Sequence, residues 1–401
     1  MTGKAMDPGV EGDCDVLIAG AGLVGLALAP ALARTGLRVA LADRAPVVAP
    51  ESPADEAGWD TRVYAISPGS AAFLRAQGAW QALPPERLAP IEAMRIAGDG
   101  GATLEFSAYE LGERALAWVV EERALRAALV PLAHAAGVAM YAPRTFASLA
   151  WSPRAGVVRF DDGSCVTARL VVAADGLRSW VREAAGILAA PKPYGQTAVV
   201  ANFSCERAHG GRARQWFRAD GGILAWLPLP GRRISIVWSA PEALAIDLLA
   251  LEPAALAARV EAAGGNALGR LECITPAAGF PLTFMKLPTT IAHRIALVGD
   301  AAHGVHPLAG QGVNLGFGDA EALTAVLRER GPVSDPGAPI LLERYARRRV
   351  EPVLAMQTVT DGLMHLFDTA APWLKAARNL GLSTVDRLPL AKRLLAQSAL
   401  R

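Results

Sequence analysis

The N-terminal part of the chain alternates between strand-like and helix-like patterns of hydrophobic positions. Residues 15–19 form a short apolar run that ends at a glycine, which is typical of a fully buried strand. Residues 23–34 are predicted to form a helix that ends at Gly36, because glycine readily adopts the left-handed cap conformation. Residues 38–42 predict the next strand. This strand–helix–strand unit implies a parallel sheet that is covered by helices.

Later segments predict further elements of both kinds. Helices are expected at three places: residues 67–77, 121–136 and 252–263. A hairpin over residues 157–170 turns at an Asp-Gly pair, and a buried strand is expected over 170–174. The first pattern returns with a strand at 295–298, followed by a glycine-rich loop and a helix that ends near Arg328. After Pro339 the chain is predicted to be helical.

Strands follow one another with little helix between them from about residue 190 to 285. Proline and glycine separate the strand-like segments, which are residues 197–205, 222–227 and 233–238. Such a succession suggests a separate antiparallel sheet. Residues 91–107 contain an Asp-Gly-Gly turn and are expected to add a hairpin to this same sheet.

One hydrophobic run is long enough to raise the question of a membrane span. Residues 16–33 contain no charged side chain, and 18 residues is about the lower limit for a transmembrane helix. Gly20, Gly22 and Gly25 inside the run, with Pro30 after them, instead favour a strand, a turn and a helix of a globular domain. Acidic residues among the first fifteen also argue against a secretory signal.

Composition excludes several classes of protein. The chain has 401 residues with 40 Lys and Arg against 38 Asp and Glu, and this balance argues against nucleic acid as a partner. A hydrophobic content of 52% with 19% charged residues excludes a disordered chain. The four cysteines lack the spacing of a zinc or redox motif, so we expect reduced thiols.

A glycine-rich turn, Gly-Ala-Gly-Leu-Val-Gly at residues 20–25, follows the first strand and opens the first helix. Its first glycine permits a tight turn, its second lets the backbone approach a pyrophosphate, and its third lets helix and strand pack closely. Asp43 ends the second strand eighteen residues beyond Gly25, where an acid can bind a ribose hydroxyl. The pattern predicts dinucleotide binding but does not separate NAD from FAD.

Two further motifs favour FAD over NAD, because they resemble motifs of a known FAD-dependent family. Residues 171–179, Val-Val-Ala-Ala-Asp-Gly-Leu-Arg-Ser, resemble the Asp-Gly motif of the FAD-dependent aromatic hydroxylases, the class A flavoprotein monooxygenases. Residues 299–303, Gly-Asp-Ala-Ala-His, resemble the Gly-Asp motif of that family. Residues 307–314, Pro-Leu-Ala-Gly-Gln-Gly-Val-Asn, resemble its flavin loop. Three motifs in this order are far more specific than any one of them.

The resemblance narrows to the ubiquinone-biosynthesis hydroxylases through shorter segments, which are residues 60–67, 118–126, 306–316, 345–349 and 360–367. It covers nearly the whole chain and is weakest over residues 190–275, the part expected to touch substrate. It implies an α/β fold with a discontinuous Rossmann-like FAD-binding domain, an inserted antiparallel β-sheet substrate domain and a C-terminal helical region. The expected boundaries are 13–90, 108–187 and 287–335 for the FAD-binding domain, 91–107 and 188–286 for the substrate domain, and 336–401 for the helical region.

The resemblance also implies which residues contact FAD. The expected contacts on the adenosine and pyrophosphate side are Gly20, Gly22, Gly25, Asp43, Arg44, Arg62, Arg123, Phe146 and Asp175. The glycines would hold the pyrophosphate, Asp43 the ribose, the arginines the FAD chain and the Phe146 backbone the adenine, while Asp175 would support the pyrophosphate or the nicotinamide donor. Asp300 would bind the ribityl chain. The residues expected to wrap the isoalloxazine ring are Pro307, Gly310, Gln311, Gly312, Val313 and Asn314.

Three positions depart from the family pattern. Asp43 stands where the family usually has Glu, although the shorter side chain should still reach the ribose. Glu122 stands where Asn is common, which puts that contact in doubt. Pro30 lies inside the first helix, where proline typically costs about 3 kcal/mol, and we expect a kink there.

His303 and His306 leave three interpretations open. They could be a metal pair, a catalytic base, or structural parts of the flavin loop. No third ligand is near in sequence, and Pro307 breaks helical geometry directly after them, so no metal is expected.

The resemblance implies an FAD-dependent monooxygenase that uses NADH or NADPH and O2 to hydroxylate a polyprenylated phenol in ubiquinone biosynthesis, through a flavin C4a-hydroperoxide. Because the flavin carries the chemistry, no catalytic residue is assigned. Two alternatives stay open: a hydroxylase of a small soluble phenol, and a non-catalytic FAD-bound scaffold of the biosynthetic assembly. Apolar residues on the sheet face of 190–285 would favour the polyprenylated substrate, and an Arg or Lys there would favour the small phenol.

The C-terminal region, residues 340–401, is locally basic, with ten Lys and Arg against five Asp and Glu. This excess is either a solvated helix face or a surface for anionic lipid or a partner protein, which would suit a polyprenyl substrate. We expect a cytoplasmic protein, with peripheral contact to the inner membrane and membership of a ubiquinone-biosynthesis complex left open.

Overall fold

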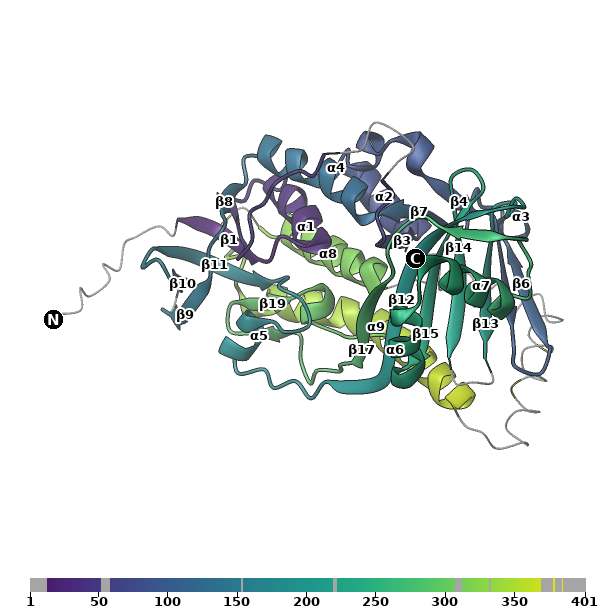
Figure 1. Cartoon of the computed structure of the whole chain (residues 1–401). Helices are drawn as coiled ribbons and strands as arrows, with labels where there is room; N and C mark the ends of the chain where they lie inside the picture. The colour runs from purple at the N-terminus through teal and green to yellow at the C-terminus, as the bar shows by residue number, and fades with distance from the viewer. Residues whose placement is uncertain are drawn as a thin grey trace.

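The computed structural model describes residues 13–51, 58–152, 154–218, 222–306, 312–331, 333–368, 378 and 384. Two large β-sheets lie side by side, and helices pack against each of them (Figure 1). The order of elements confirms the predicted α/β class, in which a β-rich segment interrupts the nucleotide-binding part of the chain.

The first sheet contains five parallel strands in the order β19, β11, β1, β2, β8. Their bounds are β1 (Cys14–Ala19), β2 (Val39–Ala42), β8 (Ala139–Tyr141), β11 (Cys165–Ala173) and β19 (Ile295–Leu297). Three antiparallel strands complete the sheet: β9 (Phe146–Trp151), β10 (Gly156–Phe160) and β18 (Ile291–Ala292). The predicted hairpin is confirmed, but its second strand and the buried strand expected after it are one element, because β11 runs unbroken into the parallel sheet.

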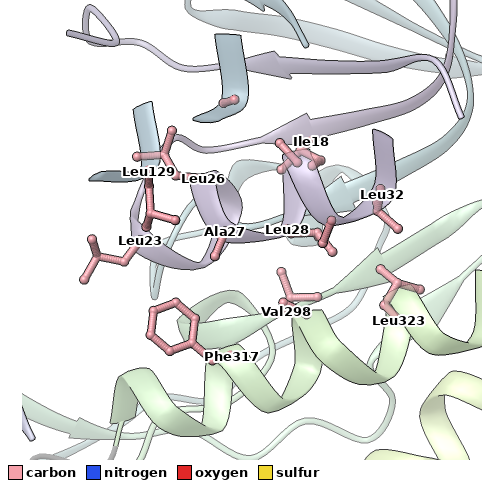
Figure 2. Close-up of a cluster of buried hydrophobic side chains, with 14 of the residues drawn as sticks. Ile18, Leu23, Leu26, Ala27, Leu28, Leu32, Leu129, Val298, Phe317 and Leu323 are labelled. Atoms are coloured by element: carbon pink, nitrogen blue, oxygen red, sulfur yellow. The ribbon is translucent and has the colours of Figure 1, made fainter. Parts of the chain in front are cut away.

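Helix α1 (Leu23–Ala33) packs against α4 (Glu122–Ala135) and α8 (Gly312–Arg328). Figure 2 shows the cluster that these helices form with the sheet, with Leu26 and Leu28 of α1 among the labelled side chains. Nearly every face of α1 is buried, which explains why the sequence of this helix contains no charged side chain. The helix continues through Pro30 to its last residue. Within the part of the chain that the structure describes, no helix combines the length and the apolar character of a membrane span.

The second sheet has the strand order β16, β12, β15, β14, β13, β5, β6, and β17 also pairs with β12. Its strands are β5 (Ala93–Ala97), β6 (Thr103–Ser107), β12 (Lys192–Cys205), β13 (Arg212–Phe217), β14 (Ile223–Leu229), β15 (Arg233–Pro241), β16 (Leu271–Cys273) and β17 (Ala278–Phe284). The hairpin of β5 and β6 joins this sheet as predicted. However, β5 pairs with β13 in parallel, so the expectation of a purely antiparallel sheet is wrong at this one pair. The two strands are far apart in sequence, so no tight turn imposes an antiparallel direction.

Helices α6 (Glu242–Ala250) and α7 (Pro253–Ala263) cover one face of the second sheet. Helix α7 was predicted from the sequence, whereas α6 was not. Helix α6 buries only Ala245 and Leu248, which gives it little helical periodicity. On the sheet side, Trp226, Trp238 and Phe203 are almost fully buried and form the core of this layer.

A small third sheet, which the sequence patterns did not predict, joins the two large ones. It has the order β3 (Val63–Ile66), β7 (Ala117–Glu121), β4 (Ala89–Ile91). Ala65 and Val119 of this sheet pack against Ala213 and Leu227 of the second sheet. Strands of three to five residues are too short to show a clear period. The helix predicted next to it, α2 (Pro68–Ala76), begins at the Ser67 cap.

The described C-terminal part is helical, as predicted. Helix α9 (Pro339–Asp368) packs against α8. Its buried Tyr345 donates a hydrogen bond to the Leu297 carbonyl at 2.6 Å, and Gln357 donates to the Met285 carbonyl at 2.9 Å. These two contacts fix α9 to the end of β19 and to the segment after β17.

Candidate cofactor site

The predicted FAD motifs meet at the carboxyl ends of neighbouring parallel strands. The glycine turn follows β1, Asp43 follows β2, Asp175 follows β11 and Asp300 follows β19. The backbone N–H of Gly20 donates to the carbonyl of Ala42 at 2.7 Å, which fixes the turn against β2. In open α/β sheets ligands bind at this edge, so the topology gathers motifs that are far apart in sequence.

The three glycines of the turn play different structural parts. Gly20 has φ +109°, and a Cβ there would collide with the Ala174 carbonyl. A Cβ at Gly25 would collide with the Gly20 carbonyl. At Gly22, by contrast, a Cβ would meet no protein atom within 4 Å. The chain itself therefore requires Gly20 and Gly25, whereas the open space at Gly22 fits a pyrophosphate that approaches the backbone.

Asp43 holds the glycine turn in place. Its Oδ2 accepts a hydrogen bond from the Ala21 N–H at 2.6 Å, and its Oδ1 accepts one from Ala45 at 2.8 Å. Arg44 is exposed beside it. Arg126 on α4, to which the sequence analysis gave no role, donates to the Ala21 carbonyl at 2.8 Å. Asp43 and Arg126 thus bind the N–H and the carbonyl of the same turn residue.

Arg62 lies in a cluster with Glu122, the departure noted in the sequence. Its guanidinium pairs with Glu122 Oε2 at 2.9 Å, donates to the Tyr64 hydroxyl at 3.0 Å and lies 5.1 Å from the Phe280 ring centroid. Burial and the Glu122 carboxylate raise the pKa of Tyr64, so its hydroxyl stays protonated at neutral pH. Glu122 therefore acts in the apoprotein as the ionic partner of Arg62.

A buried carboxylate positions the loop that carries Arg62. The Glu121 carboxylate accepts two hydrogen bonds from the Arg87 guanidinium, at 2.8 and 3.0 Å. Its Oε1 also accepts the Asp60 N–H at 2.6 Å. Asp60 in turn accepts the backbone N–H of Arg123 at 2.9 Å. The side chain of Arg123, a predicted FAD contact on α4, donates to the Gly58 carbonyl at the start of the same loop.

Asp175 and the buried Arg182 join two of the motifs. Oδ2 of Asp175 accepts the Val181 N–H at 3.2 Å, but its buried Oδ1 has no hydrogen-bond partner in the structure. Burial raises the pKa of Asp175. Arg182 donates to the Leu177 carbonyl at 2.8 Å and to the Ala301 carbonyl at 3.1 Å, and so bridges the Asp-Gly and Gly-Asp motifs. An unpaired acceptor beside the glycine turn fits a site that receives a hydrogen-bonding ligand.

Asp300 is exposed to solvent, yet the protein around it raises the pKa of its carboxyl by desolvation. His303 and Arg62 oppose this effect by attraction. A carboxyl that water reaches while protein surrounds it is suited to accept hydrogen bonds from the hydroxyls of a bound chain.

The remaining predicted contacts divide into three groups. Phe146 stacks on Trp180 with ring centroids 5.4 Å apart at the start of β9. Asn314 accepts the Ser67 N–H at 2.9 Å and donates to the Ala65 carbonyl at 2.7 Å, so its side chain fixes α8 to β3, while Gly312 and Val313 open α8. Three predicted residues of the flavin loop lie outside the described residues: Pro307, Gly310 and Gln311.

The two histidines have separate partners. His303 Nε2 lies 2.6 Å from Asp319 Oδ2, and His306 Nε2 lies 3.3 Å from Gln196 Oε1. Among the residues that the structure describes, no group of three His, Cys, Asp or Glu side chains could hold a metal ion. Both rings are buried, and their contacts link His303 to α8 and His306 to β12.

His306 should make folding sensitive to acid. Burial lowers its pKa to about 4, whereas histidine in an unfolded chain has a pKa near 6.5. Between these values the unfolded chain binds a proton that the folded chain does not, so stability falls as the pH falls. We expect wild type to lose about 2 kcal/mol between pH 7 and 5 that His306→Asn does not lose, measured by urea unfolding of the apoprotein. His134→Asn, which removes an exposed histidine, should keep the wild-type slope, and equal slopes for all three proteins would contradict the assignment.

Comparisons with known proteins decide the family. A family model described as an FAD binding domain matches residues 13–360. The ubiquinone hydroxylase UbiL of Rhodospirillum rubrum is 39% identical over 96% of this chain and 89% of its own length. The chain belongs to the ubiquinone-biosynthesis hydroxylase family of FAD-dependent monooxygenases. The 3-demethoxyubiquinol 3-hydroxylase of Escherichia coli, 34% identical over 94% of this chain and 96% of its own length, is a second relative of this hydroxylase.

A solved structure supports the same placement. The structure of Pseudomonas aeruginosa PqsL in complex with 2-aminobenzoylacetate matches the hydroxylase with a TM-score of 0.75 and 25% identity, over 92% of this chain and 99% of the other. The residues gathered at the strand ends fit FAD, because the turn leaves room at Gly22 and Asp175 presents a free acceptor. The hydroxylase is thus an FAD enzyme, in which the cofactor supplies the redox chemistry.

Proposed function

We propose that this hydroxylase acts on a polyprenylated phenol of ubiquinone biosynthesis, with NADH or NADPH as electron donor and O2 as second substrate. The ubiquinone-related names of both relatives support this substrate class. We also propose the residue roles and domain boundaries given above, with the parallel sheet holding FAD and the second sheet receiving the substrate.

The observation that carries the proposal is the face of the second sheet that points away from α6 and α7. Gln196 on this face contacts His306, so this end of the face lies beside the residue that directly precedes the flavin loop in the chain. The three rows of cross-strand neighbours nearest Gln196 on this face are Ala198–Ser239–Ile223–Phe217, Val200–Val237–Ala225–Gln215–Ile96 and Asn202–Ser235–Leu227. The next row, Ser204–Arg233–Leu229, lies farther from Gln196, and its Arg233 donates to the Pro230 carbonyl at 3.2 Å. None of the residues in the three rows nearest Gln196 is charged, which suits an apolar prenyl chain.

The quinone profile of a deletion strain tests this function. Loss of the gene should leave ubiquinone low and a prenylated precursor that lacks one ring oxygen in excess, as measured by mass spectrometry. An unchanged profile would contradict the proposal. Complementation with Asp300→Ala separates the scaffold alternative, because a scaffold that does not need flavin would still restore ubiquinone. Accumulation of a precursor without a prenyl chain would favour the small-phenol alternative.

The basic side chains of the C-terminal region that the structure describes are paired with acidic side chains of the chain. Acidic side chains bind five of its ten basic residues, which are Arg344, Arg347, Arg348, Arg349 and Arg378. Their partners are Glu329, Glu343, Asp319 and Asp99. These five arginines therefore have acidic partners within the chain, although Arg347 stays largely exposed. We therefore propose a cytoplasmic enzyme whose contact with the inner membrane or with other biosynthetic proteins depends on basic residues beyond them.

A further inference from the structure

A buried carboxylate lies behind the turn that presents Asp300. Asp319 on α8 is 1% exposed and receives three hydrogen bonds. The backbone N–H of Gly299 donates to Oδ2 at 2.8 Å, His303 Nε2 lies 2.6 Å from the same oxygen, and Arg349 Nε donates to Oδ1 at 2.6 Å. Two of these partners flank Asp300 in the Gly-Asp motif, while the third comes from α9.

Helix α8 is shaped to admit the arginine. A Cβ at Gly318 would lie 3.1 Å from both terminal nitrogens of Arg349, so only glycine leaves the guanidinium undisturbed. Arg349 also donates to the Leu315 carbonyl at 3.0 Å. Gly316, two residues earlier, leaves space for Val24 of α1, since a Cβ there would lie 2.5 Å from Val24 Cγ2. Gly316 and Gly318 thus allow α8 to pack closely between α1 and the Arg349 side chain of α9.

The charges in this cluster depend on one another. Burial would raise the pKa of Asp319, but His303 and Arg349 lower it, so the carboxyl is ionised in the folded protein. A buried carboxylate that loses a cationic partner must shift or gain water, because its charge is no longer compensated. Removal of Arg349 should therefore disturb the position of Gly299 and His303 as well.

We propose that Asp319 and Arg349 are positioning residues for FAD, because they fix the turn of residues 299–303 and thereby hold Asp300 toward the cofactor. The inference rests on the proposed contact between Asp300 and FAD. It makes α9, which lies outside the expected FAD-binding domain, a part of the cofactor-binding machinery.

Titration of the full-length apoprotein with FAD, followed by flavin fluorescence, tests the proposal. Arg349→Gln and Asp319→Asn should each raise the FAD Kd about tenfold, the size expected when a charged hydrogen bond is lost. Arg349→Lys keeps the charge without the fork of donors and should fall between Arg349→Gln and wild type. Arg348→Gln is the matched control, because Arg348 is the preceding residue of α9 and pairs with Glu329 at the surface. Its Kd should stay within twofold of wild type.

A double-mutant cycle with Asp300→Ala separates positioning from general stability. If Arg349 acts through Asp300, Arg349→Gln should add less than twofold to the Kd of the Asp300→Ala protein. Full additivity, or a less stable apoprotein with an unchanged FAD Kd, would overturn the inference. So would an Asp300→Ala protein that binds FAD like wild type. The substrate proposal would survive each of these results, since the quinone profile tests it independently.

Discussion

Gly22→Ala is expected to weaken FAD binding by one to two orders of magnitude while the apoprotein folds normally. The backbone at Gly22 has φ −70° and ψ 177°, which any residue adopts, and its Cβ would meet no protein atom within 4 Å. Only a ligand that approaches the backbone would meet the new methyl group. Overpacking of this kind typically costs about 1–3 kcal/mol, which corresponds to the expected change in Kd.

Gly25→Ala is the matched variant for this test. Its Cβ would collide with the Gly20 carbonyl, so this substitution should lower the stability of the apoprotein itself. Thermal unfolding of both apoproteins and FAD titration of Gly22→Ala distinguish the two effects. The role of the turn would be contradicted if Gly22→Ala bound FAD as tightly as wild type, or if it unfolded as readily as Gly25→Ala.

Strands β1, β2, β11 and β19 of the first sheet could be predicted because their determinants are local. The apolar run of β1, the glycine turn and Asp43 lie within thirty residues of one another, and each carries its own sequence signal. The hairpin of β10 and β11 and helix α7 are predictable for the same reason. These features depend on period and turn chemistry, both of which a single chain displays.

Contacts between distant segments could not be predicted in this way. Arg126 belongs to a segment that carried the family resemblance, but only the fold shows that it reaches Ala21. Arg349 stood in a run of three arginines that look alike in sequence, and the structure alone separates the buried one from its exposed neighbours. The short strands β3, β4 and β7 are likewise defined by what packs on them. The sequence therefore predicted a candidate site, whereas the residues that support it could be found only from tertiary contacts.

Arg87→Met is expected to lower the free energy of unfolding of the apoprotein by about 3–5 kcal/mol. The Glu121 side chain is 2% exposed, and Arg87 donates two hydrogen bonds to it, so the substitution leaves a buried carboxylate without its bidentate partner. Urea unfolding measures the loss. Arg95→Met is the control, because the pair of Arg95 with Glu105 is exposed and should contribute less than about 1 kcal/mol.

A second substitution separates uncompensated charge from lost packing. Glu121→Gln in the Arg87→Met protein removes the buried charge while keeping an acceptor for the Asp60 N–H, so it should restore part of the stability. If lost contact with the Trp59 ring, 4.1 Å from the Arg87 guanidinium, were the main cause, the double variant would be no more stable than Arg87→Met. Restored stability would instead show that Arg87 acts by compensating the carboxylate that holds the loop of Asp60 and Arg62. FAD affinity should then recover together with stability, because the same loop carries the arginine proposed to meet the cofactor.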